Sequence, residues 1–158
     1  MTVEIGMEKY LFRARIEFSQ HIRRMLDSEI QAICTPKGNW PGVEIQKLME
    51  GEVLRDRILV NAMYDISAVR RNDSVKYDGV IASQIMKNRY IIIDYHTHPG
   101  TSAKPSWPDI ASFFNFELEA GHKMVHVIES SSGEITAWDI SDCVKPSFYQ
   151  LKKDFGYG

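Results

Sequence analysis

The chain has 158 residues, of which 44% are apolar, 25% are charged and 11% are aromatic. This profile is typical of a single globular domain over residues 1–158, and it excludes fibrous, disordered and disulfide-rich classes. The formal net charge is −2, so no basic surface for nucleic acid is indicated. Without an apolar run near the roughly 20 residues of a membrane span, or a secretory pattern, we expect a cytoplasmic protein with reduced thiols at Cys34 and Cys143.

The first half of the chain predicts a strand, a helix and two further strands. Arg13–Phe18 alternates polar and apolar residues, which indicates a short half-buried strand. Ser19 is a suitable helix N-cap, and apolar side chains then recur at helical spacing until Pro36. The segments Val43–Leu54 and Arg57–Tyr64 are predicted to be strands.

The second half of the chain continues the alternation of helices and strands. In chain order we expect a charged loop at 70–74, a short helix at 80–86, a buried central strand at 90–95, a helix at 108–120, and two hairpin strands at 124–128 and 134–140. The final residues, 155–158, are expected to fray. The complete order predicts an α/β (α+β) fold, with a mixed sheet flanked by helices on both faces.

One segment carries residues that suit a metal ion. His96 and His98 leave the end of the predicted central strand, and residues two apart in an extended chain point to the same side. Asp109 falls in the first turn of the next helix, where the helix dipole favours a carboxylate. Two imidazoles and one carboxylate suit Zn²⁺ with a fourth position left open, which is the catalytic arrangement.

The same residues also allow a purely structural interpretation. A His-x-His pair is often two histidines on a loop. Ser106-x-x-Asp109 matches a helix capping box, in which both side chains satisfy free backbone N–H groups. The two interpretations are compatible, because capping would fix the start of the helix that aims Asp109.

Taken together, His96-Thr97-His98-Pro99 and, after six residues, Ser106-Trp107-Pro108-Asp109 resemble the JAMM motif of the JAB/MPN metalloproteases, H-[ST]-H-P-x6-S-x-x-D. The resemblance implies a JAB/MPN-like domain with its core over roughly residues 13–140.

The resemblance also implies the role of each residue. His96, His98 and Asp109 would hold one zinc ion, and Ser106 would help to steady the tetrahedral intermediate. An upstream glutamate would act as general acid and base.

Two glutamates compete for that last role. Members of the resembled family place it after the first helix, at the start of a strand, with a glycine seven residues later, and Glu44 with Gly51 fits this pattern. These relatives commonly have glycine three residues after the glutamate, where this chain has Lys47, so the match is incomplete. Glu29 stays open as the alternative, although it lies on the polar side of the predicted helix.

The resemblance implies a zinc-dependent isopeptidase that cleaves ubiquitin or a ubiquitin-like protein after its C-terminal glycine, with metal-activated water. One alternative is a hydrolase of the same fold that acts on another peptide, in sulfur-carrier processing or on cell-wall or phage peptides. A non-catalytic MPN scaffold is the other, and it is disfavoured because every motif residue is present. No membrane or nucleic-acid partner is expected, and the oligomeric state and any activating partner stay open.

Overall fold

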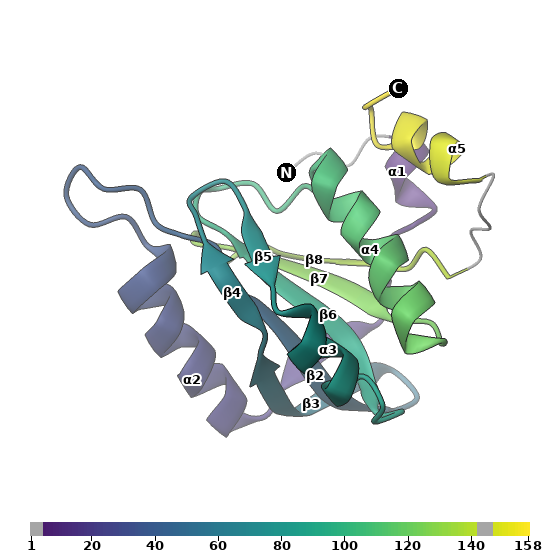
Figure 1. Cartoon of the computed structure of the whole chain (residues 1–158), viewed down its shortest axis with the longest axis horizontal. Helices are drawn as coiled ribbons and strands as arrows, with labels where there is room; N and C mark the ends of the chain where they lie inside the picture. The colour runs from purple at the N-terminus through teal and green to yellow at the C-terminus, as the bar shows by residue number, and fades with distance from the viewer. Residues whose placement is uncertain (1–4, 142–146) are drawn as a thin grey trace.

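The computed structural model describes residues 5–141 and 147–158 (Figure 1). Its strands are β1 (Arg15–Phe18), β2 (Gln46–Val53), β3 (Arg57–Asp65), β4 (Ser67–Arg70), β5 (Val75–Tyr77), β6 (Ile91–His98), β7 (Val125–Ser130) and β8 (Ile135–Trp138). Its helices are α1 (Ile5–Glu8), α2 (Gln20–Glu29), α3 (Gly79–Ile85), α4 (Trp107–Ala120) and α5 (Ser147–Asp154), and a π-helical turn over Ile30–Cys34 prolongs α2. No helix in these two ranges is both long and apolar enough to cross a membrane.

The main sheet is mixed, as the sequence predicts. Its strand order is β1-β3-β2-β6-β7-β8. The central strand β6 pairs antiparallel with β2 and parallel with β7, and α4 makes the connection between β6 and β7. The β6-α4-β7 unit matters for function, because it places the C-terminal end of β6 beside the start of α4.

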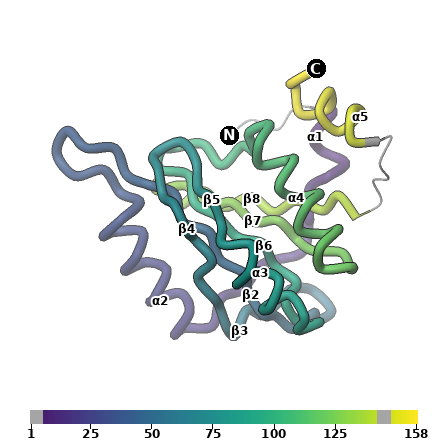
Figure 2. Tube along the Cα trace, in the orientation of Figure 1, coloured from purple at the N-terminus to yellow at the C-terminus, as the bar shows by residue number. Residues whose placement is uncertain are grey.

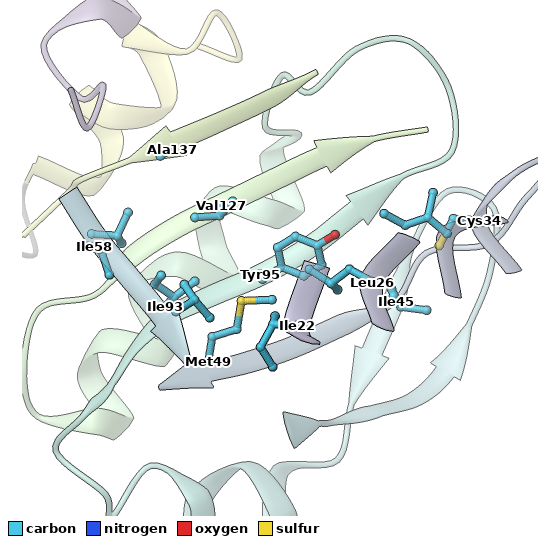
Figure 3. Close-up of a cluster of buried hydrophobic side chains, with 13 residues drawn as sticks. Ile22, Leu26, Cys34, Ile45, Met49, Ile58, Ile93, Tyr95, Val127 and Ala137 are labelled. Carbon is cyan, nitrogen blue, oxygen red and sulfur yellow. The ribbon is translucent and has the colours of Figure 1, made fainter. Parts of the chain in front are cut away.

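The largest apolar cluster lies between α2 and one face of the sheet. Ile22 and Leu26 of α2 pack against Ile93 and Tyr95 of β6 and Val127 of β7, and all of these side chains are buried (Figure 3). Helical spacing on α2 and alternation on the strands bring these residues to one surface. Burial of this surface holds α2 on the sheet.

The opposite face of the sheet is covered by α3 and α4. Phe113 of α4 belongs to a cluster with Ile128 of β7, while Phe116 of α4 and Ala82 of α3 share another cluster with Leu48 of β2. Helices therefore flank both faces of a mixed sheet, which confirms the predicted α+β architecture.

Two segments differ from the sequence predictions. The charged loop expected at 70–74 is present as the turn of a two-stranded hairpin, but its flanking strands β4 and β5, in which Arg70 pairs with Val75, were not expected. Its strands have four and three residues, too short to show a clear alternation.

The chain end does not fray as expected. Phe155 is fully buried, and its ring stacks on Tyr10 with centroids 5.6 Å apart, so α1 and α5 lie side by side (Figure 2). Cys143 lies outside the described residues.

Candidate metal centre

The alternation of β6 directs two histidines to the α4 face of the sheet. His96 is buried and His98 is partly buried at the end of the strand. Thr97, between them, points to the α2 face, where its Oγ1 accepts a hydrogen bond of 3.0 Å from the Ile45 N–H and lies 3.2 Å from Cys34 Sγ. The sequence prediction that the two imidazoles project together, with Thr97 on the other side, is confirmed.

Asp109 reaches the histidines from the first turn of α4. The Ser106 N–H donates to Asp109 Oδ2 at 2.8 Å, and the Asp109 N–H donates to Ser106 Oγ at 3.2 Å, which is a complete capping box. The capping interpretation is therefore correct. It is also compatible with metal binding, because the same hydrogen bonds fix the carboxylate in front of the histidines.

Potential ligand atoms of three side chains converge between the end of β6 and the start of α4. His96 Nε2 lies 3.0 Å from His98 Nε2 and 3.1 Å from Asp109 Oδ1, and His98 Nε2 lies 3.1 Å from Asp109 Oδ2. A tetrahedral zinc ion with bonds of about 2.0–2.1 Å separates its ligand atoms by about 3.3 Å. The three residues thus fit a zinc ion, and among the described residues they form a group whose ligand atoms lie close enough together to hold a metal ion.

The tautomer of His98 also fits a metal ligand. His98 Nδ1 lies 3.1 Å from the carbonyl oxygen of Ser102, which can only accept a hydrogen bond. A proton on Nδ1 satisfies this contact and leaves Nε2, the atom that faces His96 and Asp109, as the nitrogen available to a metal ion. A hydrogen bond to the second ring nitrogen is the usual way in which proteins orient a metal-binding histidine.

The electrostatics of the cluster favour a cation. Although burial opposes the charged form, the Asp109 carboxylate raises the pKa of His96 to about 9. Burial likewise opposes ionisation of Asp109, but His96 and His98 hold the pKa of this carboxyl well below its usual range. The carboxylate is thus ionised, and positive charge is stabilised beside it.

Glu44 lies at the same cluster, just before β2. Its side chain is buried, with Oε1 3.9 Å from His98 Nε2. Its backbone N–H donates to the Arg71 carbonyl at 2.7 Å, which ties the residue to the β4–β5 hairpin. Burial raises the pKa of Glu44 to about 7, so this carboxyl is suited to exchange a proton near neutral pH.

Glu29, the alternative to Glu44, is placed elsewhere. Its Oε1 accepts a hydrogen bond of 2.8 Å from Lys47 Nζ, between α2 and β2. Lys47 therefore points away from the metal cluster, and its bulk does not crowd the site. The structure brings Glu44, and not Glu29, to His96, His98 and Asp109.

A small cavity of about 80 Å³ adjoins the cluster. It is lined by site residues and by the end of the β4–β5 hairpin: Glu44, His96, Ser106 and Asp109, with Asp73, Ser74 and Val75 on the hairpin side. The hairpin therefore forms one wall of the cavity.

Two further polar residues lie at the cavity that the sequence did not predict as part of the site. Gln46 and Asp94 also line it, and Gln46 Nε2 donates to Asp94 Oδ1 at 3.1 Å. Their spacing in the sequence could have indicated them, because Gln46 follows Glu44 by two residues and Asp94 precedes His96 by two. Residues two apart in a strand share a face, so each of these pairs continues the polar surface of the site.

Comparison with known proteins identifies the family to which the chain belongs. No curated protein sequence matches the chain. A family model described as prokaryotic homologs of the JAB domain matches residues 13–141, which include Glu44, both histidines, Ser106 and Asp109. The chain therefore belongs to the family of prokaryotic JAB-domain homologs.

Proposed function

We propose that this protein is a zinc-dependent peptidase of the JAMM type, which cleaves a ubiquitin-like protein after its C-terminal glycine. The observation that carries the proposal is the convergence of His96, His98 and Asp109 within hydrogen-bond distance of one another, with Glu44 beside them at a small cavity. A structural zinc site is normally closed by four protein ligands, whereas three ligands beside an acid–base group are typical of hydrolysis.

The residues around the cavity divide the chemistry of amide hydrolysis. A bound Zn²⁺ would lower the pKa of water from about 15.7 to about 7. The Glu44 carboxylate would take up the proton of the attacking water and then pass it to the leaving amine. Ser106 Oγ accepts the Asp109 N–H, which leaves its own hydroxyl proton available, and this proton would be donated to the oxygen of the scissile carbonyl.

The size of the cavity supports glycine at the cleaved bond. The cavity of about 80 Å³ is lined closely by residues of several elements and leaves little room for a bulky side chain. A peptide bond without bulky flanking side chains fits this space better than one that follows a large residue. We propose that the substrate tail binds in an extended form, as an added strand at a sheet edge near the site.

The proposal is tested by metal analysis and by cleavage of linear fusions of several ubiquitin-like proteins, with peptidoglycan-type peptides as the alternative substrates. We expect about one zinc per chain. Glu44→Gln should keep the zinc and lose about 10²–10⁴-fold in kcat, the usual contribution of positioned proton transfer.

Glu29→Gln is the matched control and should keep both zinc and activity. Full activity of Glu44→Gln would contradict the proposed general base, and absence of zinc binding would contradict the proposed function. Cleavage of the peptidoglycan-type peptides alone would replace the proposed substrate and leave the zinc chemistry in place.

A further inference from the structure

Next to the metal cluster, a second row of ionisable side chains crosses the same face of the sheet. His126 of β7 is fully buried, and its ring lies between two carboxylates. Its Nδ1 is 2.9 Å from Asp94 Oδ2 on β6, and its Nε2 is 2.8 Å from Glu117 Oε2 on α4. Each ring nitrogen is therefore within hydrogen-bond distance of a carboxyl group, and the ring bridges β6 and α4. The ring also stacks on Phe113 of α4, with centroids 4.3 Å apart.

We infer that Asp94, His126 and Glu117 form a positioning clamp, which fixes α4 on the sheet and so sets Asp109 against His96 and His98. The inference rests on the proposed function only in that His96, His98 and Asp109 are taken to hold zinc. None of the clamp residues is one of the three candidate metal ligands, although Asp94 lines the same cavity.

The clamp joins the elements that carry the site. Asp94 precedes His96 by two residues on the same face of β6, and Glu117 follows Asp109 by eight residues, about two turns of α4. Gln46 of β2 donates to the second oxygen of Asp94 and itself follows Glu44 by two residues. Each segment that carries a site residue thus also carries a residue of this network. Asp94 lies on β6, Glu117 on α4, and Gln46, which is bonded to the clamp, at the start of β2.

Stability alone does not explain three ionisable groups at this place. Transfer of such groups from water to a buried site is costly, and apolar residues of similar volume often stabilise a protein as well or better. Ile110, Phe113 and Phe116 already give α4 an apolar contact with the sheet. Apolar contacts are non-directional, whereas two hydrogen bonds from one rigid ring fix both the distance and the orientation of the groups that they join.

The first test changes the most exposed member of the clamp. The Glu117 side chain is 15% exposed, so substitutions there should be tolerated. In Glu117→Gln the amide oxygen can still accept from His126 Nε2, but in Glu117→Leu nothing can. We expect Glu117→Leu to weaken zinc binding about tenfold, at the lower end of the range for residues that support metal ligands. Glu117→Gln should stay close to the wild type.

Zinc affinity is measured by competition with a chelator, and the ligand geometry by the absorption spectrum of the Co²⁺-substituted protein. Neither measurement requires a substrate. If Glu117→Leu binds zinc with wild-type affinity and an unchanged Co²⁺ spectrum, the clamp is refuted. If the wild-type protein binds no zinc, the proposed function fails instead, so the two failures are distinguishable.

The second test removes all three ionisable groups together. The triple variant D94L/H126L/E117L leaves no unpaired ionisable group of the clamp, but Gln46 Nε2 loses its acceptor, so the urea midpoint should stay close to that of the wild type. We expect zinc binding to be weakened tenfold or more with an altered Co²⁺ spectrum. Wild-type zinc affinity in a stable triple variant would overturn the inference. If the triple variant does not fold, the comparison of Glu117→Leu with Glu117→Gln decides.

The matched control is the ion pair of buried Lys47 with partly exposed Glu29 on the opposite face of the sheet. Lys47 Nζ lies 2.8 Å from Glu29 Oε1, and its side chain is 3% exposed. The double variant K47M/E29Q removes this pair without touching β7 or α4, and we expect zinc affinity and the Co²⁺ spectrum to be unchanged. An equal loss of zinc affinity in this control would show that any buried ion pair in the sheet has the same effect, and would contradict a specific role for the clamp.

Discussion

The two faces of β2 and β6 are built from alternate residues of the same strands, yet they differ in chemistry. Toward α2, Met49, Ile93 and Tyr95 are fully buried and contribute to one apolar cluster. Toward α4, Gln46, Asp94 and His96 are just as well buried, but they are polar or ionisable. The comparison teaches that both faces gain free energy from apolar packing, since Leu48 is fully buried against Phe116 on the α4 side, and that the α4 face in addition carries a row of buried polar and ionisable groups.

The polar face is tolerated because its groups are paired. Gln46 donates to Asp94, His126 bridges Asp94 and Glu117, and His96 faces Asp109. A buried polar group without a partner is costly, whereas a paired one contributes little net stability. Substitutions of polar residues on the α4 face should therefore change mainly metal binding. Substitutions on the α2 face should change mainly the free energy of unfolding.

The largest effect is expected for Asp109→Asn. The asparagine oxygen can still accept the Ser106 N–H, so the capping box is kept in part, but the negative charge between His96 and His98 is lost. We expect zinc affinity to fall by more than the 10–100-fold typical of residues outside the ligand set, and hydrolysis to be lost with it. The checks are chelator competition and far-ultraviolet circular dichroism, which should show a retained fold. Zinc binding at wild-type affinity would remove Asp109 from the ligand set.

The difference between the faces also explains how much the sequence could predict. His96, His98, Ser106 and Asp109 were found because they lie within 14 residues, so strand alternation and a helix cap place them without knowledge of the tertiary fold. Glu44 needed the resemblance to a family in addition, since spacing alone left Glu29 as a rival.

Longer-range features could not be predicted in the same way. The clamp joins Asp94 to His126 across 32 residues, and the packing of Phe155 on Tyr10 joins opposite ends of the chain. Such contacts depend on strand order and helix placement, and a single sequence carries no local signal for either. The β4–β5 hairpin was missed for another reason, because its strands are too short for period-two alternation to be seen.

An intermediate effect is expected from a cavity on the α2 face. Leu26 is fully buried in the cluster between α2 and the sheet, so Leu26→Ala should lower the free energy of unfolding by about 2–5 kcal/mol. Urea denaturation of the metal-free protein measures this change. Met25, its neighbour on α2, is 42% exposed, and Met25→Ala is expected to stay within about 0.5 kcal/mol of the wild type. Zinc affinity of the folded protein should be unchanged in both variants, and a loss of zinc affinity in Leu26→Ala alone would mean that the two faces are coupled.

The smallest effect tests the boundary between the faces. Thr97 lies between two ligands in sequence but points to the α2 face, where its hydroxyl accepts the buried Ile45 N–H. Thr97→Val keeps the shape of the side chain and leaves that N–H without this acceptor, so the free energy of unfolding should fall by about 1–3 kcal/mol. Thr97→Ser retains the hydroxyl and should recover most of the loss. Because the backbone of β6 is held by β2 and β7 on either side, we expect His96 and His98 to keep their positions and zinc affinity to stay within about threefold of the wild type. A stable Thr97→Val protein with much weaker zinc binding would show that the α2 face also determines the geometry of the ligands.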